Sequence, residues 1–166
     1  MRLFAAIKLP GEIAEELRKL QKQISDDGLR FVKDFHLTLK FYGEVQEDKV
    51  GKLKEELSKV KFEPFEASLN GVGVFPNMHH INVVWLGLEP EQKFREIADQ
   101  IEKDERFKAH ITLARVKFLK DKPGFRQKLE SVTVPKLSFK VDKFYLIKST
   151  LTPEGPVYED LAEFGQ

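Results

Sequence analysis

The sequence predicts an α+β fold built from a duplicated unit, and two observations support that prediction. The tetrapeptide His-x-Thr-Leu occurs as His36–Leu39 and again as His110–Leu113. Ordinary residue frequencies give this pattern on the order of once per ten thousand positions, so two copies in 166 residues indicate a duplication. Each copy lies in an alternating apolar–polar segment typical of a strand, with a helical pattern on either side. We therefore expect two facing copies of one α+β unit within a single two-lobed domain, residues 1–166.

The first half of the chain alternates between the periods of strands and of helices. Its pattern predicts strands over 2–8, 29–32, 36–42, 62–69, 71–75 and 81–88, and amphipathic helices over 12–26 and 47–60. Asn70-Gly71 is a turn signal between two of these strands. Trp85 lies in an apolar run, which assigns it to the core.

The second half continues the same alternation. Its pattern predicts helices over 90–103 and 122–131, and strands over 109–118, 137–148 and 157–164. Pro90 suits the first turn of its helix, where a missing N–H costs nothing. The second motif therefore falls on a strand between two helices, as the first does.

The composition excludes several classes of function. Lys and Arg total 28 while Asp and Glu total 27, so any phosphate contact has to come from a local cluster, and a shallow salt dependence is expected. The absence of Cys excludes thiol nucleophiles, disulfides and zinc–thiolate sites. Lys8 interrupts an N-terminal apolar run that is too short for a signal peptide, and no stretch approaches the roughly 20 apolar residues of a membrane span. We expect a soluble, cytoplasmic monomer.

The two histidines and their threonines are the leading candidates for chemistry. Strand alternation places His36 and Thr38 on one face, and His110 and Thr112 likewise. A strand histidine is often only a polar residue of the fold, but its repeated context favours catalysis. Because imidazole titrates near neutral pH, one histidine can hold a proton while the other accepts one. Two imidazoles and two hydroxyls suit proton transfer around an anionic group.

Residues beyond the motifs are weaker candidates. The planar guanidinium of Arg115 suits an oxyanion or a base, but strand parity points it away from His110 unless a bulge intervenes. Phe41 has the same offset from His36, with core packing as its alternative role. Lys40 shares the predicted face of His36, where it would either screen phosphate charge or lie at a solvated edge.

His79-His80 follows a strand in a predicted loop. A metal site is one interpretation of the pair, but no carboxylate or His-x-His accompanies it at ligand spacing. A solvated turn is the favoured interpretation.

The chain resembles the 2H phosphoesterase superfamily, most closely its RNA 2',3'-cyclic phosphodiesterase branch, also called 2'-5' RNA ligase. The resemblance rests on the two motifs and on the segments RLFAAI at 2–7, HLTLKFYG at 36–43, GVGVFPN at 71–77, HITLARVKF at 110–118 and STLTPEGPVY at 149–158. It implies a bilobal fold with pseudo-twofold symmetry, in which an antiparallel sheet from each lobe lines a central cleft and the helices lie outside.

The resemblance also implies a reaction and its residues. The reaction is metal-independent, cofactor-free hydrolysis of RNA 2',3'-cyclic phosphate ends, such as those of tRNA fragments, to 2'-phosphates. His36 would be the general acid that protonates the leaving 3'-oxygen, and His110 the base that activates water. Thr38 and Thr112 would hold the phosphate oxygens.

The resemblance also implies that two further residues contact the substrate. Arg115 would add positive charge at the phosphate and would sandwich the terminal base together with Phe41. Microscopic reversibility allows 2'-5' ligation at the same site. Two alternatives stay open: a phosphodiesterase for another small cyclic phosphate or a 2'-5' oligonucleotide, and a module that binds RNA ends without turnover.

Overall fold

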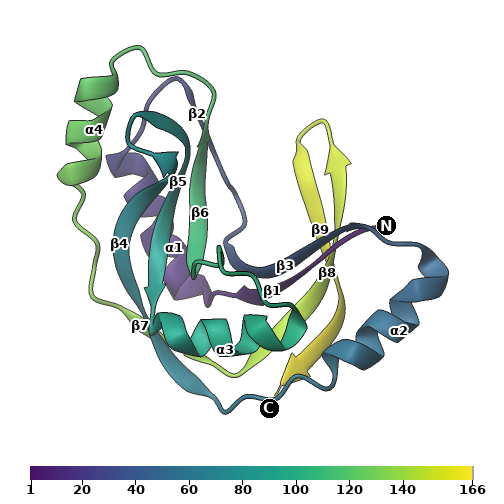
Figure 1. The fold of residues 1–166 in the computed structure, drawn as a ribbon. Helices are drawn as coiled ribbons and strands as arrows, with labels where there is room; N and C mark the ends of the chain where they lie inside the picture. The colour runs from purple at the N-terminus through teal and green to yellow at the C-terminus, as the bar shows by residue number, and fades with distance from the viewer. Residues whose placement is uncertain (166) are drawn as a thin grey trace.

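The computed structural model describes residues 1–165 and confirms the α+β fold class (Figure 1). The strands are β1 (Arg2–Lys8), β2 (Leu29–Phe31), β3 (His36–Glu44), β4 (Phe65–Asn77), β5 (His80–Glu89), β6 (His110–Val116), β7 (Ser138–Val141), β8 (Lys143–Thr152) and β9 (Gly155–Gly165). The helices are α1 (Gly11–Gln23), α2 (Glu47–Leu57), α3 (Glu91–Ile101) and α4 (Lys122–Glu130). No helix within residues 1–165 is long and apolar enough to cross a membrane.

The strands form two antiparallel sheets. One has the order β3-β1-β8-β9 and the other the order β2-β6-β5-β4-β7. Figure 1 shows the β8–β9 hairpin rising on one side and β2, β5 and β6 on the other, with β1 and β3 between them. The helices lie at the periphery of this arrangement, as the resemblance implies.

The two repeats exchange strands between the sheets. Apart from the short strands β2 and β7 and the final strand β9, each repeat runs strand, helix, motif strand, helix, strand, so that β1 corresponds to β5, β3 to β6, and β4 to β8. Each motif strand pairs with the first strand of its own repeat: β3 with β1, and β6 with β5. The next strand in each sheet comes from the other repeat, since β8 pairs with β1 and β4 pairs with β5. Each lobe is therefore made from both halves of the chain.

One hydrophobic core joins the two sheets and their helices. It contains Leu3 and Leu37 from the first sheet, Ile111 and Leu86 from the second, and Leu17 from α1, all of them at most 1% exposed. Because the same cluster supports both motif strands, burial of this apolar surface fixes the two motifs relative to each other.

Two strand boundaries differ from the sequence prediction. Asn70-Gly71 is not a turn: β4 runs through both residues with one extra residue against β5, and the chain reverses at Met78-His79 instead. Neither Asn70 nor Gly71 has the positive φ that an Asn-Gly hairpin turn requires. The predicted strand 137–148 is interrupted at Asp142, because β7 belongs to one sheet and β8 to the other.

Candidate active site

A β-bulge places Phe41 on the same face as the first motif. His36, Thr38 and Phe41 pair with Lys8, Ala6 and Phe4 of β1, respectively. Those β1 residues alternate along one strand, so they and their partners share a face. Between Thr38 and Phe41 the pairing slips by one residue, and the bulge residue Leu39 is buried in the core.

The second motif strand carries a bulge at the same place. His110, Thr112 and Arg115 pair with Gly87, Trp85 and Val83 of β5, respectively. The extra residue lies at Leu113, and both Leu113 and Ala114 are fully buried. The bulge that a role for Arg115 requires is therefore present, and each bulge follows its histidine by three residues. The repeats match in backbone shape as well as in sequence.

Gln21 of α1 holds the second bulge in place. This buried side chain is 8% exposed, and its Nε2 donates to the Leu113 carbonyl at 3.0 Å and to the Val32 carbonyl at 2.9 Å. The Val32 N–H also donates to the Leu113 carbonyl, at 3.1 Å. The sequence analysis assigned Gln21 no role, because a single Gln on a helix gives no signal of its partners.

His36 lies against two aromatic rings. It stacks on Phe4 with ring centroids 4.9 Å apart, and Tyr158 of β9 meets it edge-on at 5.1 Å. Burial lowers the pKa of His36 below its ordinary 6.5; the charge of Asp34 opposes that shift and the charge of Lys8 adds to it. Lys8 is itself paired with Asp160. Tyr158 therefore belongs to the site, although the sequence analysis gave it no role.

His110 has a matching aromatic environment and one anchored nitrogen. Phe75 and Trp85 meet its ring edge-on at 5.0 and 6.0 Å. Its Nδ1 lies 2.6 Å from the Lys108 carbonyl, which can only accept, so Nδ1 carries the proton and Nε2 is left with the lone pair. Burial lowers the pKa of His110, against the effect of the Lys108 carbonyl and of Glu91. Trp85 is thus a wall of the site, which corrects its assignment to the core.

Tyr158 and Arg115 lie on different sheets, near enough for the charge of one to act on the other. The charge of Arg115, on β6, lowers the pKa of Tyr158, on β9, although burial raises that pKa overall. β3 and β6 also contact each other directly. A cavity of about 580 Å³ opens beside His36, lined on its other sides by Lys33, Asp34 and Tyr158, while His110 is not among its lining residues.

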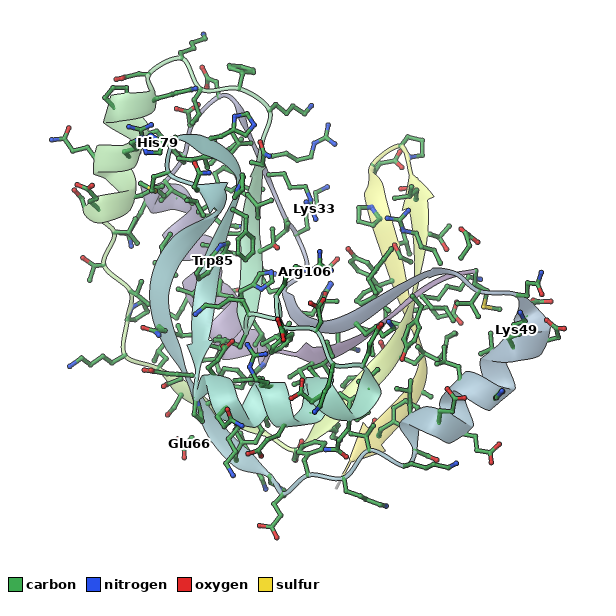
Figure 2. All side chains as sticks on the ribbon, viewed as in Figure 1. Lys33, Lys49, Glu66, His79, Trp85 and Arg106 are labelled. Atoms are coloured by element: carbon green, nitrogen blue, oxygen red, sulfur yellow. The ribbon has the colours of Figure 1, made fainter. Side chains whose placement is uncertain are left out.

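The connection before β3 reaches across this cavity. Lys33 extends from it toward the β8–β9 hairpin, where its Nζ donates to the Glu154 carbonyl at 3.4 Å (Figure 2). This contact joins the β2–β3 connection to the β8–β9 hairpin beside the cavity.

Lys40 does not share the face of His36. The bulge pairs Lys40 with Ala5, whose side chain lies in the core on the opposite face, and the Lys40 ammonium forms an ion pair with Glu102.

Phe41 is 52% exposed, and the guanidinium over its ring is that of Arg2, 5.0 Å from the centroid. The sandwich of a base between Phe41 and Arg115 stays a prediction.

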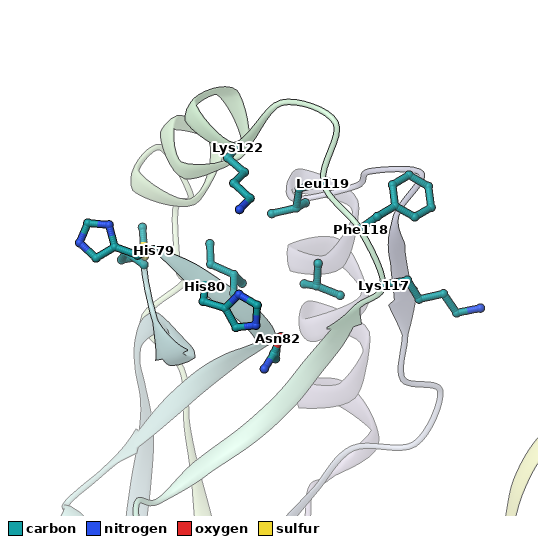
Figure 3. Close-up of a pocket in the computed structure, with 10 residues that line it drawn as sticks. His79, His80, Asn82, Lys117, Phe118, Leu119 and Lys122 are labelled. Atoms are coloured by element: carbon teal, nitrogen blue, oxygen red, sulfur yellow. The ribbon is translucent and has the colours of Figure 1, made fainter.

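His79 and His80 lie away from the motifs, at the β4–β5 turn. They line a cavity of about 130 Å³ between that turn and the connection from β6 to α4, and Figure 3 shows their rings pointing in different directions. Both backbone N–H groups donate to Asn77 Oδ1, at 2.9 and 3.0 Å, which stabilises the turn. Within residues 1–165, no three His, Asp or Glu side chains gather as metal ligands would.

The comparison with known families agrees with this duplicated geometry. The model of the LigT-like phosphoesterases matches the chain twice, over residues 7–85 and 86–158, and each match contains one His-x-Thr-Leu motif. The chain belongs to this family. Membership confirms the resemblance to 2H phosphoesterases and assigns one repeat to each half of the sequence.

Named relatives and solved structures of LigT-like phosphoesterases extend along the whole chain. RNA 2',3'-cyclic phosphodiesterases of Methanocaldococcus jannaschii and Archaeoglobus fulgidus are each 36% identical over 99% of this chain, and cover 100% and 99% of their own lengths. A Thermus thermophilus crystal structure has a TM-score of 0.84 at 31% identity, covering 99% of this chain and 97% of its own. Escherichia coli LigT complexed with 3'-AMP has a TM-score of 0.79 at 28% identity, covering 99% and 96%.

Proposed function

We propose that this chain hydrolyses RNA 2',3'-cyclic phosphate ends to 2'-phosphates by acid–base catalysis between His36 and His110. The observation that carries the proposal is the pair of bulged motif strands, each of which turns an imidazole, a hydroxyl and a third side chain to one face. The relatives named RNA 2',3'-cyclic phosphodiesterase support the same substrate.

The proton transfers follow from the two histidine environments. Neutral His110, with its Nδ1–H held by the Lys108 carbonyl, accepts a proton at Nε2 from a water that attacks phosphorus. The bond from phosphorus to the 3'-oxygen breaks, and protonated His36 supplies the proton that this oxygen needs. The phosphate stays on the 2'-oxygen, and solvent restores both histidines.

The remaining groups stabilise charge and position the nucleotide. Thr38 and Thr112 donate hydroxyl hydrogen bonds to the nonbridging oxygens, whose negative charge Arg115 offsets. The exposed ring of Phe41 offers a stacking surface for the terminal base. No step in this scheme requires a metal or a cofactor. Ligation is the same displacement with a 5'-hydroxyl in place of water: the new bond joins phosphorus to the 5'-oxygen while the bond to the 3'-oxygen breaks. The abundance of water disfavours it.

Product analysis tests the proposal. The protein is incubated with a 2',3'-cyclic mononucleotide in excess chelator, and the product is identified by ³¹P NMR. We expect the 2'-phosphate alone, with kcat lower by about 10²–10⁴-fold in either His36→Ala or His110→Ala. His79→Ala is the matched control, because His79 is an exposed histidine of the β4–β5 turn. A 3'-phosphate product, loss of activity in chelator, or full activity in either active-site variant would contradict the proposal.

A further inference from the structure

β2 and β6 carry two arginines directly opposite each other. Arg30 of β2 pairs with Arg115 of β6 in the antiparallel register, so both side chains leave the same face. That face also carries His110 and Thr112, because Arg115 shares it with them. Directly opposite residues have Cβ atoms about 4.5–5.5 Å apart. Both arginines are exposed.

Nothing in the described chain neutralises this pair. Within residues 1–165, neither Arg30 nor Arg115 forms a salt bridge or a side-chain hydrogen bond. Like charges directly opposite on two strands are destabilising, and anions bound beside them offset that cost. The arginine pair is therefore suited to successive phosphates of one strand, one beside each guanidinium.

Lys117 adds positive charge just beyond the end of β6. It lies two residues after Arg115, in the bend that follows Val116, and it is exposed. Its backbone N–H donates to the Gly28 carbonyl at 2.7 Å, which keeps it beside the start of β2. Lys117 also lines the cavity of His79 and His80, and Figure 3 shows its side chain extending in the opposite direction from these two histidines.

We propose that Arg30 and Lys117 bind the backbone phosphates of the RNA strand that precedes the cyclic end. This inference rests on the proposed function and deepens it, because it names the residues that would make an RNA strand a better substrate than a mononucleotide. Arg115 serves the terminal phosphate, and Arg30 and Lys117 extend the anion site away from His110. The local cluster compensates for the near-neutral net charge of the chain.

Steady-state kinetics with two substrates tests the inference. Arg30→Gln and Lys117→Gln are compared with the wild type on a 2',3'-cyclic mononucleotide and on a short RNA with a 2',3'-cyclic phosphate end. We expect kcat/KM for the RNA to fall about three- to fivefold in each variant at low salt, with unchanged kcat/KM for the mononucleotide. The slope of log kcat/KM against log salt should decrease in magnitude by about 0.7 per contact removed. Lys49→Gln, on the distant helix α2, removes the same charge and should change neither rate (Figure 2).

Two results would overturn the inference: unchanged RNA kinetics in Arg30→Gln, or an equal loss on both substrates. If the wild type hydrolyses neither substrate, the proposed function has failed. A measurement of RNA binding then still tests whether Arg30 contacts the RNA strand. In that case RNA with a 3'-phosphate end should bind Arg30→Gln more weakly than the wild type, and equal binding would overturn the inference.

Discussion

At the scale of single residues, burial shifts the pKa of both histidines in the same direction, and the difference between them lies in their hydrogen bonds. Burial lowers the pKa of both His36 and His110, so acidity alone does not distinguish acid from base. The distinction lies in their partners. Each histidine has a nearby carboxylate that favours its imidazolium, Asp34 for His36 and Glu91 for His110. Only His110 has a ring nitrogen committed to a backbone carbonyl within residues 1–165, which leaves its Nε2 with the lone pair that a base needs.

The lowered pKa values predict the pH dependence. The reactive form has His36 protonated and His110 neutral, so kcat/KM rises as pH passes the His110 pKa and falls as pH passes the His36 pKa. Because both pKa values lie below 6.5 in the free protein, the optimum of kcat/KM should also lie below pH 6.5.

The same reasoning separates kcat from kcat/KM. A bound phosphate favours the protonated form of His36 and raises its pKa, so the descending limb of kcat should lie at higher pH than that of kcat/KM. Steady-state profiles between pH 4.5 and 9 measure both limbs. Coincident descending limbs would contradict a phosphate bound beside the acid, and a kcat/KM optimum above neutrality would contradict the lowered pKa values of the two histidines.

At the scale of elements, β-bulges determine which side chains reach the site. Strand parity alone predicts that Arg115 and Phe41 point away from the histidines, and one extra residue in each strand reverses that result. The motifs, the strands that carry them and the helices around them could be predicted from periodicity. The bulges, and with them the displacement of Lys40 to the other face, could not, because a bulge depends on the pairing of the strand with its neighbour.

The side chain of Gln21 supports the bulge at Leu113, and substitution of Gln21 tests that support. Gln21→Leu removes a donor from the Val32 and Leu113 carbonyls and should lower the free energy of unfolding by about 1–3 kcal/mol, measured by urea denaturation. If Gln21 acts by positioning Arg115, kcat/KM of the Gln21→Leu/Arg115→Ala double variant should equal that of Arg115→Ala. Additive losses would show that Gln21 affects the rate independently of Arg115, and an unchanged kcat/KM in Gln21→Leu would show that Gln21 serves stability alone.

At the scale of the whole molecule, the exchange of strands makes the two halves depend on each other. A cut at the Met78-His79 turn leaves β1 paired only with β3 in one fragment. The other fragment keeps the β5–β6 and β8–β9 pairs but loses β4, to which β7 pairs. The sequence predicted the repeat but not the exchange, since strand order depends on contacts between the halves.

The fragments 1–78 and 79–166 therefore should not fold separately. We expect neither to show a cooperative thermal transition by near-ultraviolet circular dichroism, because each lacks part of both sheets and of the shared core. Mixing them should restore the transition and the activity. Cooperative unfolding of either fragment alone would mean that the exchange contributes little to stability.

The central claim is that one histidine gives a proton while the other takes one, and a change of leaving group tests it most directly. The substrate is a 2',3'-cyclic phosphate in which sulfur replaces the 3'-oxygen; a thiolate has a conjugate-acid pKa of about 8.5 and leaves without a proton. The measurement is kcat/KM of His36→Ala and His110→Ala on the oxygen and sulfur substrates. We predict that sulfur restores most of the rate lost in His36→Ala and none of that lost in His110→Ala. Equal rescue of both variants, or of neither, would contradict the asymmetry.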